Sequence, residues 1–294
     1  LGLAGIQAFI DDVAVPTVTS GVPLTLGALS ATTEGKHKLT FKATDNVGNV
    51  EALQTSFLYI DLKAPVTTSA QTPSANANGW NNVDVAVNLT VADPDLSSAS
   101  GKGSGVKETK LGVDGGVPLI GTTTTLTSQL VHTVDFFSTD NMGNIESSNR
   151  STVRIDKTKP SITPSQAPPA NLNGWNRNSV TVSFAVSDDF SGVDSGVGGF
   201  AAVALTTEGF GQSASGSVTD SSGNKTETTY SGVDIDLTAP VMDSTALPPA
   251  NVNGWRNTAV TVTFTETDAL SGIDTPAVDV TLKAEGYGQS VTGF

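Results

Sequence analysis

Cysteine is absent from the 294-residue sequence. This absence excludes disulfide cross-links, thiolate catalysis and cysteine-based zinc sites. Long apolar runs are absent too: no stretch of about 18 apolar residues occurs, so no membrane-spanning segment is predicted. The sequence begins at Leu1 without a signal-peptide pattern and ends inside a repeated motif at Phe294, so we expect a fragment of a longer chain.

Basic residues are scarce. Lys and Arg number 15 against 29 Asp and Glu, which gives a formal net charge of −14. An acidic surface repels phosphate backbones and anionic lipids, so no nucleic-acid partner and no membrane insertion or docking are expected. Such a surface suits a secreted protein that must stay soluble, or a protein that collects divalent cations.

Helical periodicity is also missing. No stretch keeps apolar residues at positions i, i+3, i+4 and i+7 through two turns without a Gly or a Pro. Instead the chain has 30 Gly, 14 Pro and many Thr, Ser, Val, Asn and Asp residues, which are typical of short strands joined by tight turns. The sequence therefore predicts an all-β fold.

Three short motifs recur in a fixed order along the chain. Ile-Asp-x-x-x-Pro ends at Pro65, Pro160 and Pro240, Asn-Gly-Trp ends at Trp80, Trp175 and Trp255, and Asp-x-x-Gly-Asn begins at Asp45, Asp140 and Asp220. Each motif steps by 95 residues and then by 80. Identical steps in three independent motifs indicate tandem repeats.

The Ile-Asp-x-x-x-Pro motifs mark the natural boundaries. They predict a partial repeat over 1–61, complete repeats over 62–156 and 157–236, and a second partial repeat over 237–294. Units of about 80–95 residues are large enough to bury one small core each.

Strict alternation of apolar residues follows each tryptophan. Val83, Val85, Val87, Leu89 and Val91 illustrate it in the first complete repeat. Alternation with a period of two predicts a strand with one face on a core. The same pattern appears at Val180, Val182, Phe184 and Val186, and at Val260, Val262 and Phe264. Further short strands flank each Asp-x-x-Gly-Asn turn, so a two-sheet sandwich is predicted.

The order of motifs resembles the bacterial Ig-like (Big-type) repeats of large surface and secreted proteins. Ala-Pro, Asn-Gly-Trp, a valine-rich strand, Ser-Gly-Val, Asp-x-x-Gly-Asn and Ile-Asp-x-Thr-Ala-Pro carry the resemblance, which covers essentially the whole chain. It implies tandem Ig-like β-sandwich domains in an extended string, located outside the cell. Repeats of this type serve as stalks, adhesin arms and enzyme appendages.

Oxygen-rich side chains are expected to gather at the junctions between repeats. In an Ig-like topology the Asp-x-x-Gly-Asn hairpin and the Asp-containing loop after the valine-rich strand lie at the end where the chain enters the domain. Turn formation alone accounts for the hairpin motif. The alternative is a calcium site, because calcium takes six to eight oxygen ligands.

Three junction groups follow from this topology. The first is Asp61, Asp93, Asp95, Asp140, Asn141 and Asn144; the second is Asp156, Asp188, Asp189, Asp220 and Asn224; the third is Asp236 and Asp268. Bound calcium would stiffen the chain, as in the cadherin-like linkers that these junctions resemble. The Gly- and Ser-rich segment 97–105 is interpreted as a loop without a ligand role.

The three tryptophans each follow a loop rich in Pro, Ala and Asn. The prediction is that each ring packs on the edge of its own core or on the next domain, since large aromatic side chains are mostly buried. An exposed ring could instead stack on a sugar, which would indicate a carbohydrate-binding module.

His37 and His132 lie 95 residues apart and so occupy one repeat position. The later repeats have no histidine, and no nucleophile or catalytic carboxylate pair stands out. The chain is therefore not expected to be an enzyme.

The predicted function is that of a structural or adhesive stalk whose immediate partners are the neighbouring repeats. Two alternatives stay open: glycan-binding accessory modules of a secreted polysaccharide-degrading enzyme, and a self-assembling extracellular fibre in which strand edges of different copies pair.

Overall fold

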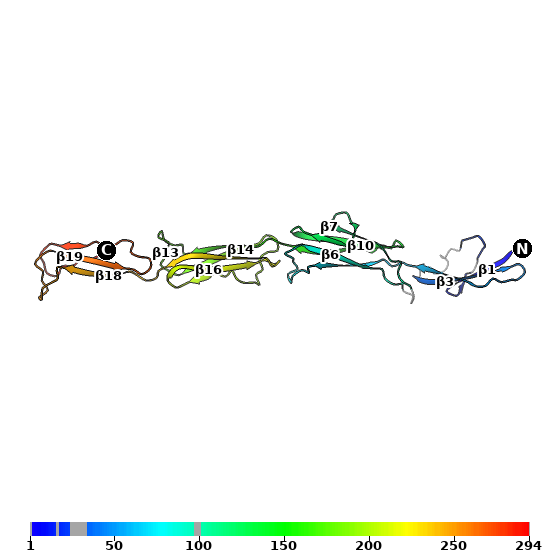
Figure 1. Cartoon of the computed structure of the whole chain (residues 1–294), viewed down its shortest axis with the longest axis horizontal. Helices are drawn as coiled ribbons and strands as arrows, with labels where there is room; N and C mark the ends of the chain where they lie inside the picture. The colour runs from blue at the N-terminus through cyan, green and yellow to red at the C-terminus, as the bar shows by residue number, and fades with distance from the viewer. Residues whose placement is uncertain (1, 16–17, 24–33, 97–100, 294) are drawn as a thin grey trace. The chain divides into compact units, whose positions relative to one another are not determined.

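The structure is a computed structural model that describes residues 2–15, 18–23, 34–96 and 101–293. Within these residues every regular element is a β-strand, which confirms the all-β prediction (Figure 1). The same residues contain no helix long and apolar enough to cross a membrane. The chain forms two compact units, 1–157 and 158–294.

The first unit begins with a single four-stranded antiparallel sheet, here called sheet A. Its strand order is β2-β1-β3-β4. The strands are β1 (Leu3–Ile10), β2 (Val13–Ala14), β3 (Gly35–Asp45) and β4 (Gln54–Ile60). β3 lies between β1 and β4 and pairs with both.

The first unit continues with two sheets that together form a sandwich. Sheet B has the order β5-β6-β9, and sheet C has the order β11-β10-β7-β8. The strands are β5 (Val66–Thr72), β6 (Val85–Ala92), β7 (Val106–Val113), β8 (Leu119–Ile120), β9 (Thr123–Leu126), β10 (Leu130–Asp140) and β11 (Asn149–Ile155).

One core joins sheets B and C. Its buried members come from both sheets: Val85, Val87, Leu89, Leu126, Val134, Phe136, Val153 and Ile155. The predicted alternation is confirmed over β6, where Val85, Val87 and Leu89 face this core. Val83, which precedes the strand, is 48% exposed, so the buried pattern begins one step later than predicted.

The second unit repeats this plan. Sheet D has the order β12-β14-β15, sheet E the order β13-β17-β16, and sheet G the order β18-β19-β20. The strands are β12 (Ser161–Ala167), β13 (Trp175–Asn176), β14 (Val180–Ser187), β15 (Val203–Leu205), β16 (Gly209–Thr219), β17 (Lys225–Ile235), β18 (Val241–Leu247), β19 (Val260–Thr267) and β20 (Val280–Leu282). Sheets D and E share cores built on Val180, Val182 and Phe184.

The fold is thus a tandem array of β-sandwich repeats. The division into four repeats, with its boundaries after Asp61, Asp156 and Asp236, stays a prediction from the sequence motifs.

The Asp-x-x-Gly-Asn motif forms the same hairpin turn each time. Asp140 Oδ1 accepts hydrogen bonds from the amides of Met142 and Asn144, at 2.9 and 2.8 Å. Gly143 has a φ of 91°, which an L side chain rarely adopts. The turns that begin at Asp45 and Asp220 bond their own amides in the same way.

The tryptophan loops are closed by an asparagine rather than by burial of the ring. Asn171 Oδ1 accepts hydrogen bonds from the amides of Asn173 and Trp175, and the loops before Trp80 and Trp255 repeat this pattern. Trp255 is 57% exposed, so the predicted packing is wrong for this ring. Trp80 and Trp175 are half-buried.

Candidate metal centre

Three aspartates from separate segments of the first unit meet where β4 leads into β5. Asp61 follows β4, Asp93 follows β6, and Asp140 ends β10. One carboxylate oxygen from each lies within 4.8 Å of the other two. Asp61 and Asp140 are buried, and Asp140 has no exposed surface. Asp61 lies in the segment 61–65, here called the first linker, so the cluster joins the linker to the domain that follows.

Backbone amides hold two of these carboxylates in place. Asp61 Oδ2 accepts a hydrogen bond from the Ser104 amide, and Asp93 Oδ2 accepts one from the Gly105 amide, both at 2.6 Å. Each oxygen keeps a second lone pair, so the amides orient the carboxylates and still leave them able to bind a cation.

Asp93 is the least satisfied member of the cluster. Its Oδ1 atom and Ser104 Oγ are buried, and neither has a partner in hydrogen-bonding geometry, although the hydroxyl is close enough to lower the carboxyl pKa slightly. Burial and the neighbouring charges of Asp61 and Asp140 raise the pKa of Asp93 overall. A divalent cation would supply the missing partner and offset the repulsion.

Asp140 is held ionised by its own turn. Burial acts to raise its pKa, but hydrogen bonds from the Asn144 side chain and from the amides of the turn outweigh it, so the pKa is lowered. Asn144 Nδ2 donates to Asp140 Oδ2 at 2.7 Å and to the Asp61 carbonyl at 3.1 Å. The turn therefore also holds the linker backbone.

Two predicted ligands of this group do not join the cluster. Asp95 is exposed, and its carbonyl oxygen accepts a hydrogen bond from Lys63 Nζ at 3.0 Å. Asn141 donates its side-chain amide to the carbonyls of Ser104 and Gly105, so it supports the loop from outside. Asp95 is not a member of the three-aspartate cluster, and a ligand role for Asp95 and Asn141 stays a prediction.

The second predicted group is divided between the two units. Asp156 is fully buried near the end of the first unit, where its amide donates to the Asn81 carbonyl. In the second unit, Asp188 Oδ1 accepts the Gly192 amide at 2.7 Å, and Asp220 is 1% exposed within its turn.

The remaining members of that group also lie in the second unit. Asn224 Nδ2 donates to Asp220 Oδ2 and to the Thr158 carbonyl, both at 2.8 Å, as Asn144 does in the first unit. Asp189 is exposed, like Asp95.

The third predicted group is a pair of carboxylates inside the second unit. Hydrogen bonds from the Ser271 side chain and from the Thr238 and Ser271 amides lower the pKa of Asp236, and Asp268 also contributes. The Ser271 amide reaches Asp236 Oδ2 at 3.0 Å, which repeats the contact between Ser104 and Asp61.

Sequence reasoning included Ser-Gly among the repeated motifs but gave it no role in these sites. The segment 97–105 was interpreted as a loop without a ligand role; residues 97–100 lie outside the described residues, and Ser104 and Gly105 hold two of the three carboxylates. The recurrence of Ser-Gly at Ser104, Ser191 and Ser271 is the sequence feature that could have identified this role.

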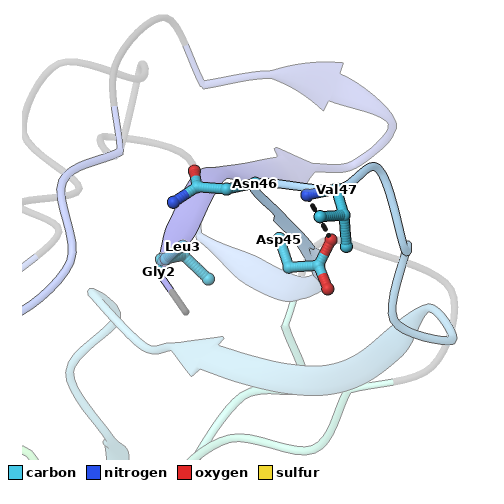
Figure 2. A pocket seen from close by; sticks show the side chains of 5 residues that line it. All are labelled: Gly2, Leu3, Asp45, Asn46 and Val47. Carbon is cyan, nitrogen blue, oxygen red and sulfur yellow. Dashed lines mark hydrogen bonds between the residues drawn. The ribbon is translucent and has the colours of Figure 1, made fainter.

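A hollow of about 410 Å³ lies beside the first hairpin turn and is lined by Gly2, Leu3, Asp45, Asn46 and Val47 (Figure 2). Figure 2 shows the Asp45 carboxylate turned back to the Val47 amide, at 3.0 Å. Among the described residues, Asp45 is the one carboxylate of this lining. The hollow therefore lacks the donor set found around Asp140.

His132 lies between an aspartate and a serine. Its Nδ1 contacts Asp114 Oδ2 at 2.8 Å, and its Nε2 contacts both Ser128 Oγ and the Ser128 carbonyl, at 3.1 and 3.0 Å. The ring is therefore held from both sides, by Asp114 and by Ser128. His37 contacts Asp11 in the same way at 2.6 Å.

Comparisons with known proteins give little beyond the architecture. No protein-family model and no curated protein sequence matches the chain. Among solved structures, the chain is similar to a 1.5-MDa bacterial ice-binding adhesin at 14% identity and a TM-score of 0.36, over 79% of this chain and 86% of that one. It is also similar to the fibronectin(III)-like modules of Clostridium thermocellum CbhA at 14% identity and a TM-score of 0.26, over 52% of this chain and 80% of that one. Similarities at this sequence identity and these TM-scores do not support any inference about function.

Proposed function

We propose that this chain is a non-enzymatic stalk segment of an extracellular or surface-exposed microbial protein, built from repeats of the bacterial Ig-like type and stiffened by calcium at the linkers. The observation that carries the proposal is the cluster of the buried Asp61 and Asp140 with the half-buried Asp93, whose Oδ1 atom has no hydrogen-bond partner. Two buried carboxylates and a half-buried one repel one another without a cation, whereas calcium would bind them favourably.

The proposed ligands are the carboxylates of Asp61, Asp93 and Asp140, with the Ser104 hydroxyl beside them. All are oxygen donors, and calcium prefers oxygen. Bound calcium would supply charge neutralisation and a tie between the linker and the repeat over 62–156. The chain's own contribution is to hold the carboxylates in place through the Ser104, Gly105 and Asn144 hydrogen bonds.

A calcium titration of the whole chain tests the proposal. Isothermal titration after chelator treatment should show binding in the range of roughly 10⁻⁴–10⁻³ M, as in extracellular calcium modules. Calcium at about tenfold above its dissociation constant should stabilise a site by about 1.4 kcal/mol, which raises the melting temperature by a few degrees.

Matched variants assign the site. Asp61→Asn should reduce the number of bound calcium ions by one, while Asp95→Asn, which changes an exposed carboxylate outside the cluster, should leave it unchanged. Absence of any calcium effect at millimolar concentration contradicts the proposal.

Glycan binding is the second candidate function. Trp255 and Tyr287 are 57% and 92% exposed, and their ring centroids lie 6.3 Å apart. Exposed paired rings can stack on sugars. Quenching of tryptophan fluorescence by soluble polysaccharides in the wild type but not in Trp255→Ala would favour this function over a pure spacer.

A further inference from the structure

Three strands begin opposite the residue that leads into a linker. The first linker, 61–65, is followed by a second, 156–160, and a third, 236–240. The first residue of β3, β10 or β16 pairs with the last residue before a linker; the pairs are Gly35 with Ile60, Leu130 with Ile155, and Gly209 with Ile235. The residue before each of these strands therefore occupies one repeat position beside the start of a linker. These residues are Glu34, Gln129 and Glu208.

At the second and third linkers this position accepts hydrogen bonds from the linker. Gln129 Oε1 accepts one from the Lys157 amide at 3.0 Å. Glu208 Oε2 accepts one from the Leu237 amide at 3.2 Å and one from the Thr238 hydroxyl at 2.9 Å. Lys157 and Leu237 each follow the linker aspartate directly, so two repeats make the same contact.

At the first linker this position makes an ion pair. Glu34 Oε1 lies 3.0 Å from Lys63 Nζ, and the Glu34 side chain is 13% exposed. Lys63 is the second residue after the linker aspartate, as Thr238 is at the third linker. The partner atom thus differs between repeats, while the contact between this position and the linker is kept.

These contacts do not belong to local turns. Each hydrogen bond joins residues that lie 28 to 30 positions apart in the sequence. Backbone bonds hold the linker aspartates beside them: the Asp156 amide donates to the Asn81 carbonyl and the Asp236 amide to the Asn176 carbonyl, both at 2.9 Å. Consecutive linker residues are therefore held by the repeat that they leave.

We propose that Glu34, Gln129 and Glu208 form a linker clamp, a repeated position that holds each linker on the repeat that precedes it and so limits bending between repeats. Every contact of the linker clamp is made between protein atoms, so the clamp acts without calcium.

The linker clamp and the proposed calcium site act on opposite sides of the first linker. The carboxylate cluster ties Asp61 to the repeat that follows, because Asp93 and Asp140 belong to that repeat. Glu34 ties Lys63 to the repeat that precedes. A linker held on one side alone leaves one joint free to bend, so a stiff array needs both ties.

The linker clamp needs a hydrogen-bond acceptor, and at the second and third linkers it does not need a charge. Gln129 makes with its amide oxygen the contact that Glu208 makes with its carboxylate. Both groups can accept a hydrogen bond from a backbone amide. Glu208→Gln should therefore keep the clamp, and Glu208→Ala should remove it.

Hydrogen exchange of the full chain in chelator tests the contact itself. The Leu237 amide should exchange about fivefold faster in Glu208→Ala than in the wild type, because one hydrogen bond is lost. Glu208→Gln should restore the wild-type rate. The matched control is Glu227→Ala, which removes an exposed glutamate of the same repeat that pairs with Lys225 and should leave the rate unchanged. An unchanged rate in Glu208→Ala overturns the proposal.

Spin labels measure the consequence for bending. The sequence has no cysteine, so Ser183→Cys and Thr265→Cys, two exposed strand positions on either side of the third linker, confine the labels to these sites. The distribution of label distances should be roughly twice as wide in Glu208→Ala as in the wild type, because a linker without ties behaves as a flexible chain. Glu208→Gln and Glu227→Ala should keep the wild-type width.

A second variant tests the same contact from the linker side. Thr238→Val removes one donor and leaves Glu208 in place, so it should widen the distribution less than Glu208→Ala, and it decides the question if Glu208→Ala does not fold. Wild-type widths in both variants overturn the proposal. All samples are measured in chelator and in calcium: a wild type that does not respond to calcium contradicts the proposed function, whereas the comparison between variants in chelator still decides the linker clamp.

Discussion

Asp93 is the residue of the proposed calcium site whose carboxylate has the fewest partners, because its Oδ1 atom accepts no hydrogen bond. Burial and two neighbouring carboxylates raise its pKa, so its charge destabilises the fold when no cation is present. Asp93→Asn removes that charge and keeps the size of the side chain. We expect the variant to melt a few degrees above the wild type in chelator, consistent with about 1 kcal/mol, and to lose the calcium shift assigned to this site.

Differential scanning calorimetry in chelator and in calcium measures both effects. Asp95→Asn serves as the control, because it removes an equal charge outside the cluster. A calcium shift that survives in Asp93→Asn would place the ion elsewhere.

The Asp114 carboxylate is expected to contribute to the stability of the fold, and this contribution should be lost in acid. The Thr133 amide and then the His132 ring lower the pKa of this carboxyl below its usual value of 3.8. A lowered carboxyl pKa contributes stability above the unfolded-state value, and that contribution is lost as the pH falls through the folded-state value. We expect Asp114→Asn to be less stable than the wild type at pH 6 and the difference to shrink below about pH 4.

Urea unfolding between pH 3 and pH 6 checks this expectation. Asp12→Asn is the comparison, since this aspartate side chain is 80% exposed and meets Lys38 only at 3.4 Å. An equal difference between wild type and Asp114→Asn at both ends of the pH range would contradict it.

The candidate site was partly predictable at the level of single residues. The repeated motifs identified Asp61, Asp93 and Asp140, because the Ig-like topology alone brings those segments to one end of the sandwich. The spacing of the motifs could not show that Asp93 joins the cluster and Asp95 does not. β6 ends at Ala92, so both aspartates lie in an irregular segment where strand alternation no longer sets the direction of a side chain. The hydrogen bond from the Gly105 amide holds Asp93 in the cluster.

At the scale of elements, β6 supplies one face of the core between sheets B and C. Val87 is 1% exposed within this core, whereas Val83 is 48% exposed just before the strand. Val87→Ala should destabilise the domain by about 2 kcal/mol, from two lost methyl groups and the cavity left behind. Val83→Ala should change stability by less than about 0.5 kcal/mol. Urea denaturation of both variants in the full chain measures the difference.

The strands were predictable because the alternation of apolar residues and the turn motifs indicate the same strands. Asp-x-x-Gly-Asn needs an aspartate that caps two amides and a glycine at positive φ, and the structure contains both at Asp140 and Gly143. The exposure of Trp255 was not predictable. Asn251 Oδ1 closes its loop by accepting hydrogen bonds from the Asn253 and Trp255 amides, without help from the Trp255 ring, so average burial of aromatic residues gives no guidance there.

At the scale of the whole molecule, the cores define which segments can fold alone. All eight buried members of the core between sheets B and C lie within 62–156. Sheet A, by contrast, leaves Phe41 37% exposed over β3. A single sheet with an open apolar face is a poor independent fold, since stability depends on covering that face.

The expected outcome is that residues 62–156, expressed alone, unfold in one cooperative transition, whereas residues 1–61 alone do not. Circular dichroism and urea denaturation measure this, and the slope of the transition scales with the surface exposed on unfolding. Residues 62–156 lack Asp61, so this fragment should also lose the calcium response assigned to the first linker while it keeps its fold. A cooperative transition of 1–61 would show that this segment completes its own core, and it would contradict this expectation.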